Sequence, residues 1–163
     1  MAVEVLQTLR DLISIPSVNP MRPCPGEAVE REVADYVESV LRRAGIDCER
    51  QTVFEGRENV IGVVHASVSG EGSRRGLMFN SHMDTVPVAN MAIDPFDPVV
   101  RDGRVYGRGA CDAKGPIAAI ETVVCGPGDV AQAHTKDEYV EVEQLERAVR
   151  LYSRVIDGWP RAA

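Results

Sequence analysis

The residues of this chain whose types and spacing best suit chemistry are a histidine and an aspartate two positions apart. His82 and Asp84 follow the short apolar run Leu77–Phe79 and precede a turn with Pro87. Open α/β sheets build sites where a buried strand delivers polar groups at its C-terminal end. Residues two apart in an extended chain point to the same face. The pair therefore either converges on one centre, or Asp84 lies behind His82 and fixes its tautomer. A metal or catalytic role and a structural turn role fit this pattern equally well.

A third candidate is Asp112, in the glycine-rich loop 107–115 before a short apolar segment. An aspartate at such a place is commonly a helix N-cap or an Asx turn. Its carboxylate is also a suitable ligand for a hard or borderline cation. The loop lacks the third glycine of a dinucleotide fingerprint and the Gly-Lys-Ser/Thr of a phosphate loop, so it is a weak signal for a nucleotide site.

The chain has two further histidines. His65 lies in an apolar run and is interpreted as a core or edge histidine, since no ligand partner stands near it in sequence. His134 follows a glycine-rich turn, and taken alone it is typical of a surface loop.

The elements that must position these groups alternate between helices and strands, which predicts an α/β fold with a layered α/β/α sheet. Gly45 is expected to cap a helix, and Asp102-Gly103 predicts a hairpin turn. The runs 59–66 and 76–80 are apolar enough for interior strands, whereas 47–54 resembles an edge strand. The predicted helices are 3–13, 27–43, one beginning at 117–120, and 143–156; the predicted strands are 47–54, 59–66, 76–80, 99–101, 104–106 and 122–125.

Length and composition favour a single globular domain. The chain has 163 residues, of which 44% are hydrophobic and 26% charged. A net charge of -7 argues against nucleic acid or an anionic membrane as a partner. No stretch has the apolar length of a membrane span, and residues 1–4 do not resemble a signal peptide. Four cysteines without C-x-x-C spacing indicate neither a zinc knuckle nor a disulfide framework. We therefore expect a cytoplasmic protein.

Three segments together resemble the signatures of the M20 metallopeptidase family. They are Ser81-His82-Met83-Asp84-Thr85-Val86-Pro87, then Tyr106-Gly107-Arg108-Gly109-Ala110-Cys111-Asp112-Ala113-Lys114-Gly115, and last the stretch 126–140 with His134. The residues of these segments are most similar to the signatures of the acetylornithine deacetylase and succinyl-diaminopimelate desuccinylase branch. The resemblance implies a shortened M20 (zinc-peptidase-like) catalytic domain and a metal-dependent cleavage of the amide in N-acyl amino acids.

The resemblance also implies a role for each candidate residue. In the family two metal ions share a site, and by motif His82 would bind one ion, Asp112 would bridge both, and His134 would bind the second. Asp84 would be the catalytic residue that hydrogen-bonds His82 and fixes which ring nitrogen faces the metal. A cis peptide bond would follow the bridging aspartate, at Asp112-Ala113.

One part of the family pattern is missing from this sequence. Members carry an adjacent Glu-Glu pair, whose first glutamate is the general base, and a lid or dimerisation domain between the second and third signatures. This chain has no two adjacent glutamates. Residues 1–120 join directly to residues 122–163, so we expect one truncated catalytic-type domain, 1–163, without the lid. Glu121 at the junction is more typical of an exposed helix residue than of a replacement base.

This loss changes the expected chemistry. His82, Asp112 and His134 suffice for one open zinc site, so at most one ion is expected, with cobalt or manganese as alternatives to zinc. Hydrolysis is expected to be impaired without the general base. The substrate would be a small N-acylated amino acid such as acetylornithine or succinyl-diaminopimelate. Self-association through surface exposed by the deletion is expected. The alternative is a non-enzymatic remnant or interaction module without bound metal.

Overall fold

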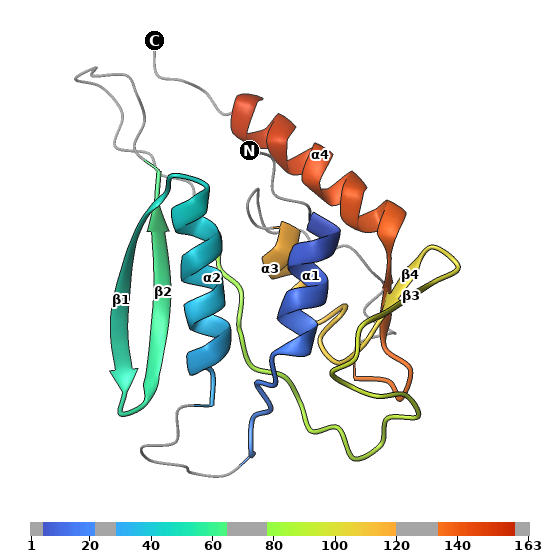
Figure 1. Cartoon of the computed structure of the whole chain (residues 1–163). Coiled ribbons are helices and arrows are strands. Elements are labelled where there is room, and N and C mark those ends of the chain that lie inside the picture. The colour runs from blue at the N-terminus through green and yellow to red at the C-terminus, as the bar shows by residue number, and fades with distance from the viewer. Residues whose placement is uncertain (1–4, 22–28, 65–77, 120–133, 159–163) are drawn as a thin grey trace, which may run out of the picture.

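The computed structural model describes residues 5–21, 29–64, 78–119 and 134–158 (Figure 1). The chain contains both helices and strands, which confirms the predicted mixed α/β class. The elements are α1 (Val5–Ser14), α2 (Arg31–Arg43), β1 (Asp47–Phe54), β2 (Arg57–Val63), β3 (Val99–Arg101), β4 (Arg104–Tyr106), α3 (Lys114–Ala119), β5 (Tyr139–Glu141) and α4 (Val142–Gly158).

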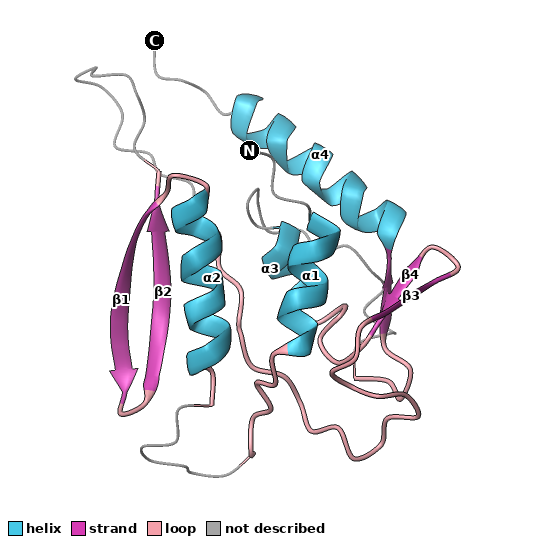
Figure 2. Cartoon of the chain, viewed as in Figure 1, coloured by secondary structure: helices cyan, strands magenta, loops and turns pink. Residues whose placement is uncertain are grey.

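The strands form two separate antiparallel sheets in the part of the chain that the structure describes. One is the β1–β2 hairpin, which lies against α2 at one side of the molecule (Figure 2). β1 has the bounds and exposed character predicted for an edge strand. β2 was predicted as an interior strand, but it pairs only with β1 among the described residues and much of it is exposed. Apolar content alone therefore overestimated its burial, because burial depends on which strands pair on both sides.

The end of α2 follows the capping geometry expected at Gly45. Gly45 has a φ of 80°, in the left-handed region that glycine adopts without a steric cost. The amide of Ile46 donates to the carbonyl of Leu41 at 3.0 Å, and the amide of Gly45 donates to that of Arg42. These two bonds are the Schellman motif, which turns the chain out of α2 and into β1.

The hydrophobic core lies where α1, α3 and α4 meet (Figure 1). α1 and α4 come from opposite ends of the described chain, so the core joins its N-terminal and C-terminal parts. α2 adds Val33 from the side of the hairpin. The buried core residues are Leu9, Leu12, Ile13, Val33, Val105, Ala110, Ala118, Ala119, Val140, Leu145 and Ala148.

The second sheet brings together two segments that are distant in sequence. β3 and β4 form the predicted hairpin, and both central turn residues, Asp102 and Gly103, have positive φ as a type I′ turn requires. β5 pairs with the other edge of β4, so that the buried side chains of Val105 and Val140 lie opposite each other. This pairing places Glu138, just before β5, beside the loop that carries Asp112, and the start of α4 beside the β3–β4 turn.

The prediction of a strand at 76–80 is wrong for the residues of it that the structure describes. Residues 78–80 of the predicted strand 76–80 form no strand, and Met78 is exposed. An extended segment becomes a strand only when a neighbour pairs with its backbone. Just beyond this segment, the described chain has a single parallel bridge, between Val18 and Thr85. The predicted strand 122–125, His65 and Glu121 lie outside the described residues.

No described helix is long and apolar enough to cross a membrane.

Candidate functional site

The three predicted metal ligands come together around one carboxylate. The Nε2 atom of His82 lies 2.9 Å from Oδ1 of Asp112, and the Nε2 atom of His134 lies 2.8 Å from Oδ2 of Asp112. The aspartate thus stands between the two imidazoles and contacts each through a different oxygen. The three residues are called the His82–Asp112–His134 cluster below.

Asp84 lies behind His82, and only His82 of this cluster makes a hydrogen bond with it in the described structure. Nδ1 of His82 is 3.0 Å from the Asp84 carboxylate and 3.0 Å from the Asp84 carbonyl oxygen. Asn19 donates from its side-chain amide to the same carboxylate at 2.7 Å. Of the two arrangements that the spacing left open, the structure therefore has the one in which Asp84 orients the ring of His82.

The segment with His82 and Asp84 is held by the loop that follows α1. The amide of Thr85 donates to the carbonyl of Ser17, and the amide of Asn19 donates back to the carbonyl of Thr85. The buried hydroxyl of Ser17 donates to the carbonyl of Met83 at 2.7 Å. These bonds replace the sheet pairing that was predicted to fix the position of His82.

Asp112 is held through its backbone in the loop between β4 and α3. The peptide bond Asp112-Ala113 is cis, as the resemblance implied. The amides of Cys111 and Asp112 each donate to Oε1 of Glu138 at 3.1 Å. The loop closes onto α3 through the amide of Lys114, which donates to the carbonyl of Gly109 at 2.8 Å.

His134 stands at the start of the last described segment and has a φ of 65°. A left-handed conformation is uncommon for a residue other than glycine, although histidine is among those that adopt it most often. Two residues further on, the carbonyl of Lys136 accepts a hydrogen bond from the amide of Ala92 at 2.8 Å. This bond attaches the His134 segment to the loop that follows the His82 segment.

The electrostatics of the cluster favour a positive charge at its centre. Partial burial on its own lowers the pKa of His82, but the hydrogen bonds and charges of Asp112 and Asp84 outweigh it, so the pKa of His82 is raised. Burial likewise raises the pKa of Asp84, but the hydrogen bond from Asn19 and the charge of His82 lower it by more. Carboxylates accept hydrogen bonds, and each ring nitrogen of His82 faces one.

The donor types of the cluster fit a divalent metal, while their number falls short of a two-metal site. Imidazole nitrogen and carboxylate oxygen are both zinc ligands, and a cation beside Asp112 would take the place of the Nε2 proton of His82. The side chains now contact one another directly, and no group of three or more His, Cys, Asp or Glu residues is spaced for an ion in the described ranges. Three ligands are enough for one open zinc site.

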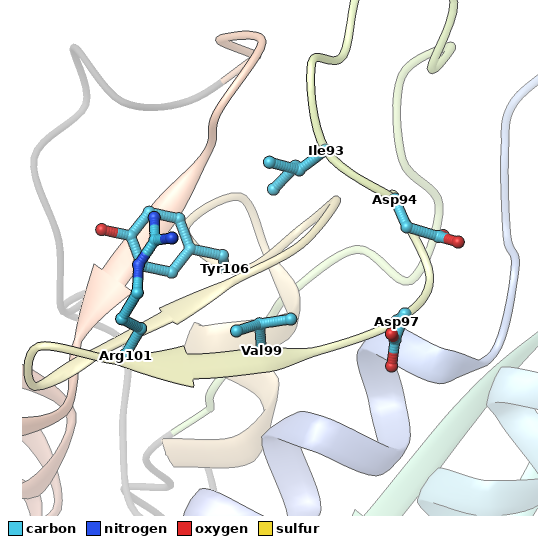
Figure 3. Close-up of a pocket in the computed structure, with 6 residues that line it drawn as sticks. All are labelled: Ile93, Asp94, Asp97, Val99, Arg101 and Tyr106. Atoms are coloured by element: carbon cyan, nitrogen blue, oxygen red, sulfur yellow. The ribbon is translucent and has the colours of Figure 1, made fainter.

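The cluster is open to water. The side chains of His82 and His134 are 51% and 52% exposed, and that of Asp112 is 34% exposed. A separate hollow of about 90 Å³ lies beside β3, where the Arg101 guanidinium covers the ring of Tyr106 at 5.1 Å (Figure 3). Small-molecule sites usually have volumes of about 300–1,000 Å³, and no cluster residue lines this hollow. We therefore assign no ligand to it.

Two sets of residues at the site were not found from the sequence. Asn19 lies in a proline-rich loop, and only its distant contact with Asp84 reveals its role. Arg108 and Glu138 form a fully buried ion pair at 2.7 Å, although most charged residues are exposed. Arg108 and Glu138 lie inside the segments that carried the family resemblance, and that resemblance was the available signal for them.

Lys114 is another buried charged residue of the same loop. It donates to the carbonyl of Ile15 at 2.6 Å, and burial lowers the pKa of Lys114 to about 8.

The comparisons with known proteins point to one family. Residues 78–124 match the model of peptidase family M20/M25/M40. A succinyl-diaminopimelate desuccinylase of Rhodospirillum centenum is 35% identical over 127 residues, which are 76% of this chain and 30% of the relative. A succinyl-diaminopimelate desuccinylase of a Wolbachia species from Brugia malayi is 30% identical over 76% of this chain and 29% of the relative.

Solved structures support the same fold. The M20 family metallo-carboxypeptidase Sso-CP2 of Sulfolobus solfataricus superposes with a TM-score of 0.51 at 24% identity, over 72% of this chain and 25% of that one. Human carnosine dipeptidase 1 superposes with a TM-score of 0.52 at 25% identity, over 71% of this chain and 26% of that one. The chain therefore spans less than a third of the length of the relatives that it matches, and its fold resembles part of their catalytic domain.

Proposed function

Since the chain belongs to peptidase family M20/M25/M40, we propose that it is a metal-dependent amidohydrolase of the deacylase type. Its substrates would be small N-acyl amino acids such as succinyl-diaminopimelate or acetylornithine. The observation that carries the proposal is the Asp112 carboxylate, which contacts His82 through one oxygen and His134 through the other. This arrangement unites residues 30 and 22 positions apart in the chain around one centre.

His82, Asp112 and His134 would hold the metal, with zinc as the first choice and cobalt or manganese as alternatives. A bound divalent ion would polarise the acyl carbonyl and lower the pKa of water. Asp84 would keep the Nδ1 proton on His82 and leave Nε2 for the cation. Asn19 would hold the Asp84 carboxylate in that position.

Hydrolysis requires a general base that removes a proton from the attacking water, and the sequence offers no clear residue for this step. The chain has no adjacent glutamates to supply the family's general base. A positioned general acid or base is typically worth about 10²–10⁴-fold in rate. We therefore propose that residues 1–163 act as one truncated catalytic-type domain with impaired hydrolysis.

Metal content and substrate cleavage test this proposal in two steps. The purified chain should contain close to one equivalent of zinc, and His82→Ala and Asp112→Ala should contain little. Release of succinate from N-succinyl-diaminopimelate, or acetate from N-acetylornithine, should then be slow, abolished by a chelator and absent in Asp112→Ala. Absence of bound metal in the unaltered chain would refute the proposal and favour a non-enzymatic interaction module.

Self-association is the partner interaction that we propose for the hairpin. Phe54 is 71% exposed and Val64 is 77% exposed, and β1 and β2 pair only with each other among the described residues. Exposed strand edges favour pairing with another chain. Sedimentation velocity should show association that grows with concentration and weakens in Phe54→Ser. A concentration-independent monomer would contradict this.

A further inference from the structure

Glu138 is a buried carboxylate that belongs neither to the proposed metal ligands nor to the apolar core. Its side chain is fully buried, four residues after His134. One oxygen accepts hydrogen bonds from the amides of Cys111 and Asp112, both at 3.1 Å. Its other oxygen accepts from the Arg108 guanidinium at 2.7 Å. The backbone carbonyl of Glu138 also accepts from the amide of Gly107 at 3.1 Å. Glu138 therefore holds the Asp112 loop at both of its ends.

Arg108 extends these contacts to the His82 segment. Its guanidinium donates through Nη2 to the carbonyl of Pro87 at 3.2 Å, and its amide donates to the carbonyl of Pro95 at 2.8 Å. Pro87 lies five residues after His82. The Arg108–Glu138 pair thus contacts the segment after His82, the loop of Asp112 and the segment of His134.

The energetics of buried charges argue that this pair does more than stabilise the fold. Removing two charges from water costs several kcal/mol for each ion, and an apolar pair of similar volume is often as stable or more stable. What an apolar pair lacks is an acceptor for the two loop amides. Backbone amides that share one fixed acceptor constrain the residues that carry them, here Cys111 and Asp112.

We infer that Glu138, supported by Arg108, is the positioning residue that sets Asp112 between His82 and His134. It acts through the backbone of Asp112 and does not contact the metal. The inference deepens the proposed function and rests on it for its effect on metal binding. Loss of a residue that orients a metal ligand typically weakens metal binding about 10–100-fold.

Two double variants isolate the acceptor from the ion pair. Arg108→Met with Glu138→Gln removes both charges but keeps a carbonyl oxygen for the two amides. Arg108→Met with Glu138→Met removes the charges and the acceptor. Glu30→Gln is the matched control, because Glu30 is a second buried carboxylate paired with an arginine, Arg57, outside the cluster. All proteins are compared by thermal unfolding, by amide hydrogen exchange at Cys111 and Asp112, and by zinc titration.

The glutamine double variant should keep slow exchange at both amides and bind zinc within about threefold of the unaltered chain. The methionine double variant, at similar thermal stability, should exchange at least tenfold faster there and bind zinc about 10–100-fold more weakly. Glu30→Gln should change neither amide exchange nor zinc affinity.

Equal exchange at Cys111 and Asp112 in the two double variants would overturn the inference, and so would equal zinc affinity. If either double variant fails to fold, Glu138→Gln and Glu138→Leu replace the pair, both with Arg108 unchanged. Equal exchange at Cys111 and Asp112, or equal zinc affinity, in these two variants would overturn the inference. If the unaltered chain binds no zinc, the proposed function fails, while amide exchange still decides whether Glu138 holds the loop.

Discussion

At the scale of single residues, the ring of His82 is fixed from both of its nitrogens. Asp84 contacts Nδ1 and Asp112 contacts Nε2, so the orientation of the ring is set before any cation arrives. Asp84 is in turn held by Asn19. A ligand whose second nitrogen is bound to a carboxylate is more basic and better oriented.

Asp84→Asn should therefore weaken zinc binding about tenfold or more, because the amide cannot supply the negative charge behind His82. Zinc titration against a competing chelator measures this. Asp97→Asn is a suitable control, since Asp97 lines the hollow beside β3 and not the cluster. Equal zinc affinity in Asp84→Asn and Asp97→Asn would show that Asp84 has no orienting role.

Tyr36 gives a pH dependence with a defined sign. Burial, and then the hydrogen bond to Asp11 at 2.7 Å and the charge of Asp11, raise the pKa of Tyr36 from 10.0 to about 12. The folded state thus keeps this proton to higher pH than the unfolded state does. The stability from Tyr36 is present below about pH 10 and is lost as pH rises towards 12.

The difference in tyrosinate absorbance between the unaltered chain and Tyr36→Phe should show this late titration. Asp11→Asn should move the midpoint back towards 10, because it removes the acceptor charge. A midpoint that stays the same in Asp11→Asn would contradict the assignment.

At the scale of elements, the sequence predicted the strands that depend on short-range signals, but it did not predict which distant segments pair. β1 and the β3–β4 hairpin have their predicted bounds, because Asp102-Gly103 and the mostly polar run 47–54 are short-range signals. The predicted strand at 76–80 and the interior position of β2 depended on which neighbours pair with them, which composition does not encode. The pairing of β4 with β5 was likewise invisible, although it brings Glu138 to the Asp112 loop.

The contact between this loop and α3 leaves no room for a side chain at Gly115. A Cβ atom there would collide with the carbonyl oxygen of Ala110, which is backbone and cannot rotate away. Gly115→Ala should lower the free energy of unfolding by about 3 kcal/mol, as overpacking does. Urea unfolding measures it.

Gly103→Ala separates steric collision from backbone conformation. Gly103 has a φ of 71° and open space around it, so alanine there should cost only about 1 kcal/mol. A Gly115→Ala variant no less stable than Gly103→Ala would mean that the loop and α3 are not in close contact.

At the scale of the whole molecule, the site depends on the same packing that joins the two ends of the described chain. The predicted ligands His82, Asp112 and His134 were identified from motif resemblance, and the structure brings them together. Their supports, Asn19 and the Arg108–Glu138 pair, were not predicted, because no motif assigned them a role and their contacts join segments 65 and 30 residues apart. Contacts at that separation exist only once the core of α1, α3 and α4 has formed.

If the proposal is right, zinc should stabilise the entire fold, because its three proposed ligands come from three separate segments. A ligand at 100 times its dissociation constant adds about 2.7 kcal/mol if it binds only the folded state. For a domain of this size, that is a rise in Tm of roughly 5–10 °C. Differential scanning calorimetry with and without zinc measures the shift. His134→Ala is the decisive control, since its side chain is half exposed and its loss should leave the metal-free Tm nearly unchanged. A zinc-induced shift of the same size in His134→Ala would place the ion elsewhere, and no shift in the unaltered chain would mean that zinc does not bind the fold.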